Sequence, residues 1–159
     1  MIELDASGRY TRNILSKFGQ GAFYVYNTSV QAIPNGYTNT VMAIDTKVID
    51  VCTWFTTPTF TPKQPGYYLL FGKVYVEVTA TFVDATTNFY LWVRKNSAAA
   101  IPADSSVTLR RGVQLSYVAL AESNGTTDTF DLCVSHNGTG DIDCNHASFG
   151  GVFVSYNNP

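Results

Sequence analysis

The pattern of apolar and polar side chains is clearest over residues 60–79, which read F-T-P-K-Q-P-G-Y-Y-L-L-F-G-K-V-Y-V-E-V-T. Pro62, Pro65 and Gly66 exclude a helix and predict a tight turn, and the β-branched and aromatic residues after them predict a strand. Successive side chains of a strand point to opposite faces. One face of this strand is apolar throughout, with Tyr68, Leu70, Gly72, Val74, Val76 and Val78.

The opposite face of the same strand begins apolar and ends polar. Its side chains are Tyr67, Leu69, Phe71, Lys73, Tyr75, Glu77 and Thr79. A surface strand of a monomer normally has one apolar and one polar face. We therefore expect the first half of this strand to be covered on both sides, either inside a sandwich or by another copy of the chain.

The rest of the chain predicts further short strands. The sequence allows a short helix at 12–18 and shows no convincing helical amphipathicity elsewhere. The expected strands are 21–27, 41–44, 47–52, 74–82 (the end of the long strand), 88–95, 106–109, 113–122, 129–136 and 149–156. Turns are expected around Asn35-Gly36 and Asn124-Gly125, and a polar loop at 137–148. About ten strands at this spacing predict an all-β protein, an antiparallel sandwich or barrel.

Three segments, in this order and at these spacings, resemble the globular head of complement-type proteins in the tumour necrosis factor-like jelly-roll superfamily. They are A-F-Y-V-Y-N at 22–27, F-T-P-K-Q-P-G-Y-Y-L-L-F at 60–71 and S-F-G-G-V-F-V at 148–154. The resemblance covers residues 21–156. The chain departs from the family at 122–126, where Glu-Ser-Asn-Gly-Thr stands in place of the usual Gly-Asp.

The resemblance implies a two-sheet antiparallel jelly roll of about ten strands that assembles into a homotrimer. It places the aromatic strand at the trimer axis, and so assigns Tyr67, Leu69, Phe71 and Tyr75 to the trimer interface. The alternative is that these side chains face the second sheet of their own subunit.

Residues 1–20 lack sustained periodicity, and we expect an N-terminal arm there, followed by one knob domain at 21–159. The arm is either a partly ordered extension or a tether that docks on a neighbouring protein. Its sequence resembles neither a signal peptide nor a membrane span, which favours assembly inside a cell unless a leader is missing from this sequence. Only 14% of residues are charged and the net charge is -2, so we expect no nucleic acid as a partner. No apolar run approaches the roughly 20 residues that cross a bilayer, so we expect no membrane partner either.

No catalytic motif is present in the sequence, and we expect a non-enzymatic protein without a cofactor. His136, Cys144 and His146 lie close in sequence, but we interpret them as ordinary residues around a polar loop rather than a nucleophile pair or metal site. The three cysteines are expected to be free thiols; Cys133 and Cys144 are the nearest pair if a disulfide forms.

The segment D-I-D-C-N at 141–145 begins like a calcium-binding loop. His146 stands where an EF-hand has glycine and Val152 where it has its bidentate glutamate, so it is not an EF-hand. We expect a solvated acidic turn, with Asp141, Asp143 and Asn145 as the candidates for calcium ligands.

Exposed aromatic rings with nearby amides and hydroxyls are typical of carbohydrate sites. The candidates for glycan contact are Tyr37, Trp54, Tyr90 and Trp92, although tryptophans of a sandwich usually lie in its core. The sequons at Asn27, Asn124 and Asn137 are expected to be turns unless the chain is secreted.

Two functions fit the sequence. The first is a bacteriophage virion protein: a trimeric capsid decoration, head-fibre or spike knob, assembled in the host cytoplasm. It would be anchored to a capsid or other virion protein by residues 1–20 and would contribute to attachment to host glycans. The second is a secreted, complement-like ligand-binding module.

Overall fold

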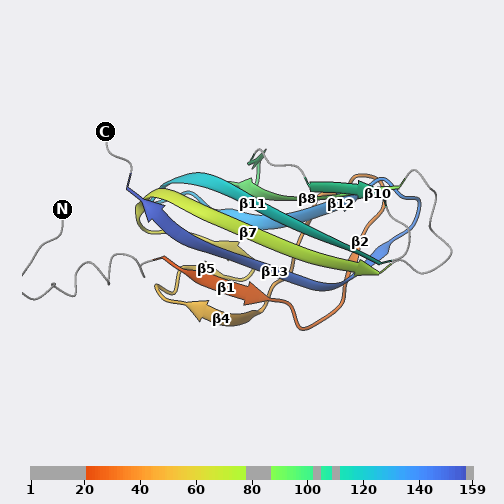
Figure 1. Ribbon diagram of the computed structural model, residues 1–159, viewed down its shortest axis with the longest axis horizontal. Coiled ribbons are helices and arrows are strands. Elements are labelled where there is room, and N and C mark those ends of the chain that lie inside the picture. Colours follow the sequence, from red (N-terminus) through yellow and green to blue (C-terminus); the bar gives the residue numbers. More distant parts are fainter. Residues whose placement is uncertain (1–20, 78–86, 102–104, 109–111, 157–159) are drawn as a thin grey trace, which may run out of the picture.

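The computed structural model describes residues 21–77, 87–101, 105–108 and 112–156. This part of the chain contains strands and turns but no helix. The strands form two antiparallel sheets that lie face to face, one in front of the other in Figure 1. The predicted all-β jelly-roll sandwich is confirmed, whereas the predicted arm at 1–20 lies outside the described residues.

The first sheet has the order β11-β7-β13-β1-β4 and faces the viewer in Figure 1. A short strand, β2, extends it by pairing with β13. The bounds are β1 Phe23–Tyr26, β2 Gln31–Ile33, β4 Thr46–Asp50, β7 Pro65–Glu77, β11 Gly112–Asn124 and β13 Ile142–Ser155.

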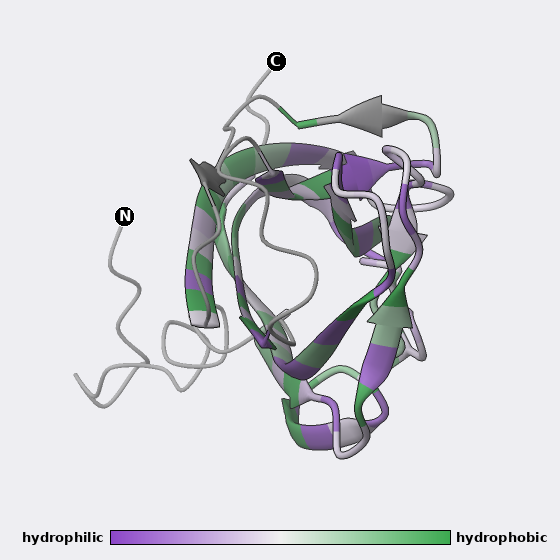
Figure 2. Ribbon diagram, turned by 90° about the vertical axis from the view of Figure 1, so that its right-hand side faces the viewer, coloured by the Kyte–Doolittle hydropathy of each residue, from purple (hydrophilic) through white to green (hydrophobic). Residues whose placement is uncertain are grey.

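The second sheet has the order β10-β8-β12-β6-β5, with β3 paired to β12 and β9 paired to β8. The bounds are β3 Thr40–Val41, β5 Phe55–Thr56, β6 Thr59–Phe60, β8 Asn88–Lys95, β9 Ala99–Ala100, β10 Ser105–Thr108 and β12 Phe130–His136. Seen from the side, the two sheets enclose one interior, and bands of apolar and polar residues alternate along the strands (Figure 2).

The core lies between the sheets and is built from the faces that alternation predicts. On β7, Tyr68, Leu70, Val74 and Val76 are fully buried, as the sequence predicts. The inward residues of the facing strand β12 are Phe130, Leu132 and Val134. Gly72 leaves room for one of them: a Cβ at this position would collide with the Leu132 side chain. The two sheets therefore interlock along β7 and β12.

The start of β7 is held by close backbone contacts. Gly66 has a φ of +148°, and a Cβ on it would collide with the carbonyl oxygen of Ser155 on β13. Only glycine fits such a conformation and approach. The sequence signal Pro65-Gly66 therefore marks the point where the long strand enters the sheet beside the end of β13.

The predicted polar loop at 137–148 is wrong, because β13 already begins at Ile142. Ile142 and Cys144 are buried, whereas Asp143 between them is exposed. The segment thus alternates like any half-buried strand, and it pairs with β2 on one side and β7 on the other. The polar side chains that suggested a loop occupy its outward face.

Two further findings concern the three cysteines and membrane-spanning helices. Cys52, Cys133 and Cys144 are all free thiols, as expected, so the fold does not depend on a disulfide. Among the described residues, the structure has no helix with the length and apolarity of a membrane span.

Candidate functional site

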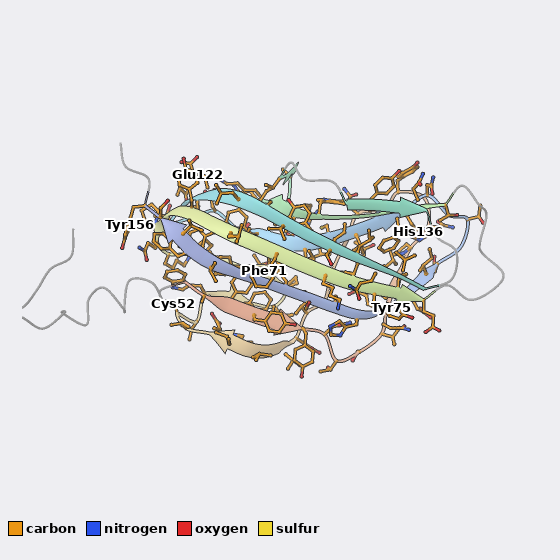
Figure 3. All side chains as sticks on the ribbon, in the orientation of Figure 1. Cys52, Phe71, Tyr75, Glu122, His136 and Tyr156 are labelled. Atoms are coloured by element: carbon orange, nitrogen blue, oxygen red, sulfur yellow. The ribbon has the colours of Figure 1, made fainter. Side chains whose placement is uncertain are left out.

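The outward face of β7 carries the residues that the sequence assigned to an interface. Tyr67, Leu69, Phe71 and Tyr75 alternate with the buried core residues of this strand and point away from the second sheet. Phe71 lies in the middle of the sheet that faces the viewer, and Tyr75 toward one end (Figure 3). The alternative in which these side chains face the second sheet of their own subunit is therefore excluded; their role in an interface stays a prediction.

Leu69 is the centre of an apolar row that crosses three strands. It is directly opposite Leu120 on β11 and Val152 on β13. These side chains are 38%, 57% and 38% exposed, respectively. Directly opposed residues have neighbouring Cβ atoms on the same face of an antiparallel sheet, so the three form one continuous aliphatic strip.

Phe71 is the centre of a second row, next to the first. Its direct neighbours are Val118 on β11 and Gly150 on β13, and Tyr24 on β1 comes next. The Phe71 and Tyr24 rings stack across the glycine with centroids 6.4 Å apart. Ile49 on β4 continues the row and is also exposed. The second row therefore spans the whole sheet.

Residues that carry a charge or a hydroxyl group bound these two rows along the strands. Glu122, Tyr67 and Ser155 flank them on one side, and Ser116, Lys73 and Ser148 on the other. An apolar centre with a polar rim is the usual anatomy of a protein–protein interface. We call the apolar centre the outer apolar face, and it consists of Tyr24, Ile49, Leu69, Phe71, Val118, Leu120 and Val152.

Sequence reasoning missed most members of the outer apolar face. The inward side of β11 consists of buried residues, among them Leu115, Tyr117 and Ala119. The opposite side of the same strand contains Val118 and Leu120, and these two apolar residues at outward positions were the available signal. Assigning Tyr24 to this face required knowledge of the strand order, which the alternation of apolar and polar residues along one strand does not reveal.

The four predicted glycan contacts do not lie together. Tyr90 and Trp92 follow one another on the outward face of β8, and the Tyr37 ring lies 6.0 Å from the Tyr90 ring. Trp54 instead lies beside Gly21 and packs against the core at the start of the first sheet. Three candidates are thus grouped on the second sheet, and Trp54 is separate from them.

The structure places the three calcium candidates at the start of β13 and directly before it. Asp141 accepts a hydrogen bond from the Asn35 N–H at 3.4 Å, and the Asn145 side chain donates to Glu77 at 2.7 Å. Asp143 is exposed on the strand, where it lies opposite Glu77. The acidic turn that the sequence predicts is therefore the start of β13. Within the described ranges, no three His, Cys, Asp or Glu side chains come close enough to hold a metal ion.

The His136, Cys144 and His146 side chains do not form a reactive group either. His136 is fully buried in the core, where Nδ1 accepts the Gly138 N–H at 3.1 Å and Nε2 lies 3.0 Å from the Ile33 carbonyl. Cys144 points inward, and its thiol lies against the carbonyl oxygen of His146 rather than against either ring. Burial raises the pKa of this thiol to about 11, although hydrogen bonds lower it in part.

A charged pair that sequence reasoning missed lies beside the aromatic residues of β8. Arg94 binds Asp131 in a bidentate manner, with Nε–Oδ1 at 2.8 Å and the second contact at 3.0 Å. Cys133 donates to the same carboxylate. Burial, followed by the nearby Asp131 charge, raises the pKa of the Cys133 thiol far above its ordinary value. This thiol therefore stays protonated, and the cluster has a structural role.

Comparison with solved structures places this architecture among known folds. The globular domain of zebrafish complement 1qA protein superposes with a TM-score of 0.62 at 17% identity, covering 87% of this chain and 100% of that one. Eiger TNF from S. frugiperda gives 0.55 at 12% identity, covering 87% and 94%. Murine APRIL gives 0.53 at 12% identity, covering 84% and 99%.

These similarities show that the chain has the tumour necrosis factor-like and complement-head jelly-roll fold, as the sequence resemblance predicts. No family model matches the sequence. No curated protein matches it either. At this level of identity the comparisons establish the fold, and the function must be argued from the surfaces of the chain itself.

Proposed function

We propose that the chain is a non-enzymatic binding knob that works as a homotrimer, held together through the outer apolar face. The observation that carries the proposal is the alignment of two apolar rows, centred on Leu69 and Phe71, in the middle of an exposed sheet. An exposed apolar patch of this kind on a folded domain marks an interaction surface. The resemblance to complement-type heads implies that the partner is two further copies.

The energetics support assembly through this face. Burying an aliphatic or aromatic side chain fully contributes about 1.5–3 kcal/mol. Leu69 and Val152 are already partly covered, so each would add a fraction of that value, whereas Val118 and Leu120 retain more than half of their surface. Because every contact is repeated three times in a closed trimer, modest gains per residue sum to a stable assembly.

The proposal is tested by placing a charge in the centre of the face. Leu69→Asp buries a carboxylate in the interface and should convert the trimer to monomer or to aggregate. The matched control is Val48→Asp on the edge strand β4, because Val48 is 57% exposed and lies outside the outer apolar face. The mass in solution of both variants is measured by sedimentation. A trimeric Leu69→Asp variant would contradict the proposed interface.

More specifically, we propose that the trimer is a knob on a bacteriophage particle and is located in the virion. It would be either a capsid decoration or the tip of a head fibre or spike. Residues 1–20 would bind a capsid or other virion protein. The composition supports this function, since only 14% of residues are charged while aromatic residues reach 14%. Electron microscopy of the parent particle with this chain labelled tests it, and particles without label at the capsid or tail would contradict it.

The second candidate is a secreted, complement-like ligand-binding module. The similarity to the zebrafish complement 1qA globular domain, which extends over that whole domain, supports it. The two candidates differ in what the full gene encodes before this domain. A leader or a collagen-like stalk encoded there would favour the secreted module. Finding this protein bound to a capsid would favour the virion knob.

A further inference from the structure

The outer face of the second sheet carries a second surface, distinct from the outer apolar face. Tyr90 and Trp92 occupy consecutive outward positions on β8, since Phe89, Leu91 and Val93 between and around them are buried in the core. Outward residues two positions apart are about 7 Å apart along a strand. Tyr37 joins them from the segment between β2 and β3, with its ring 6.0 Å from that of Tyr90. We call these three residues the aromatic patch.

Small side chains underlie the patch. On the neighbouring strand β12, Ser135 is directly opposite Tyr90 and Cys133 is directly opposite Trp92. Both small residues point outward and are nevertheless buried. Trp92 itself is partly buried and also contacts the core. The Tyr90 and Trp92 rings therefore have buried small side chains as their cross-strand neighbours on the same face.

Tyr37 is held in a conformation that a tyrosine rarely adopts. Its φ is +60°, directly after Gly36 at +78°, and its N–H donates to the His136 carbonyl at 2.8 Å. A side chain with a bulky Cβ substituent is disfavoured in the left-handed region. The ring is nevertheless 59% exposed, so burial in the core does not compensate for this backbone strain. Strain of this kind, at a largely exposed ring that lies outside the core, points to a ligand contact.

The charges beside the patch favour a neutral ligand. Arg94 is the next outward residue on β8, and both of its hydrogen bonds to Asp131 are short. The carboxylate therefore neutralises the guanidinium, which leaves little positive potential for a phosphate, sulfate or sialic acid. The residues that follow Tyr37 are the exposed Thr38 and Asn39. The Thr38 hydroxyl donates to the Asn35 carbonyl at 3.1 Å and can still accept a hydrogen bond, and Asn39 supplies an amide that can donate and accept.

We infer that Tyr37, Tyr90 and Trp92 form a binding site for a neutral carbohydrate. A pyranose ring offers a face of C–H groups that packs on the electron-rich face of an aromatic ring. Its hydroxyls need donors and acceptors at the edge of the site, which Thr38 and Asn39 provide. The inference rests on the proposed binding role of the knob but not on trimer formation, because the patch and the outer apolar face belong to different sheets.

The test combines binding and stability in one variant. Tyr37→Asn removes the ring but accepts the left-handed backbone, since asparagine is among the residues that tolerate it. We expect this variant to unfold at the same temperature as wild type or higher. We also expect its affinity for the bound sugar to fall about tenfold or more, as for removal of a central aromatic contact. A merely structural tyrosine would instead lower the unfolding temperature when replaced.

The probe is an array of immobilised oligosaccharides of glucose, galactose, mannose and N-acetylhexosamines, with sialylated and sulfated glycans beside them. Wild type should bind at least one neutral class, with little change between low and high salt. Tyr90→Ala should weaken binding as Tyr37→Asn does. Tyr156→Ala is the control, because this exposed tyrosine lies at the opposite end of the sandwich from His136, to which the Tyr37 backbone binds (Figure 3).

Three results would overturn the inference: no binding to any neutral glycan, binding only to the anionic glycans with strong salt dependence, or equal binding by wild type and Tyr37→Asn. The mass in solution of each variant is recorded in parallel. A monomer that binds sugar would contradict the trimer and leave the carbohydrate site standing. A trimer that binds no neutral glycan would contradict the site alone.

Discussion

Gly150 on β13 lies directly opposite Phe71 on β7, and the Phe71 ring covers it so closely that a Cβ at position 150 would collide with the ring. The ring thereby reaches Tyr24 on the next strand, with which it stacks. One glycine thus allows an aromatic side chain to lie flat across the sheet, and the second apolar row depends on it.

The first prediction follows from this contact. Gly150→Ala should force the Phe71 ring out of its position and lower the free energy of unfolding by about 1–3 kcal/mol, the usual cost of overpacking. In a Phe71→Ala background the same substitution should cost much less, because the colliding ring is gone. Chemical denaturation of all four proteins at one fixed concentration measures this coupling. Equal costs in both backgrounds would show that the ring does not constrain position 150.

A second prediction concerns the three thiols. Cys133 and Cys144 are fully buried and their thiol pKa values are raised, whereas Cys52 is only half-buried. Thiolates rather than thiols react with disulfide reagents. At pH 8 the native protein should therefore show at most one readily titrated thiol per chain, and denaturant should expose all three.

The control for the thiol experiment is Cys52→Ser, which keeps the other two cysteines. This variant should lose the fast native reaction and retain two slow thiols that react only on unfolding. A native Cys52→Ser protein that reacts as fast as wild type would place one of the other cysteines at the surface.

A third prediction concerns Asp128, which joins two turns at one end of the sandwich. Its carboxylate accepts hydrogen bonds from the Asn124 N–H at 2.7 Å, from the Asn96 amide at 2.9 Å and from Lys95 at 2.9 Å. Burial by itself raises the pKa of Asp128, but these hydrogen bonds lower it more, so the net pKa lies below its ordinary value of 3.8. The folded state therefore favours the ionised form.

The sign of the pH dependence follows from this lowered pKa. The stabilisation is fully present above pH 3.8 and is lost as the pH falls below that value through the lowered pKa. At pH 7, Asp128→Asn should lower the free energy of unfolding by about 1–3 kcal/mol. Asparagine is uncharged, and its single side-chain oxygen cannot replace both carboxylate oxygens as acceptors of these hydrogen bonds. Urea denaturation from pH 7 to pH 2.5 measures both proteins. The difference between them should shrink below pH 3.8, and a constant difference would contradict the assignment.

The sequence predicted the long strand β7 and both of its faces because alternation is a local property. Tyr68 and Leu70 lie in the core and Leu69 and Phe71 point outward, as the pattern required. The same rule failed at 142–148. Asp143 and Asn145 dominated the pattern there, although Ile142 and Cys144 between them mark the buried face of a strand.

The grouping of surface residues depended on information that no local pattern contains. Tyr37 and Tyr90 are far apart in sequence and meet only because β3 and β8 flank the same strand, β12. Trp54 looked equivalent to them by residue type, but it lies at the other sheet beside Gly21. Residue type identified the candidates, whereas strand order decided which of them share a surface.

The central claim is that three copies of the chain associate through the outer apolar face. The most direct measurement is the mass of the purified protein by sedimentation equilibrium over a wide concentration range, with added calcium and with chelator. We predict the mass of three 17.4 kDa chains in both conditions. Dissociation by chelator alone would instead make a metal ion part of the assembly. A monomer at every concentration would contradict the claim and leave Leu69, Phe71 and Leu120 as a surface for a different partner.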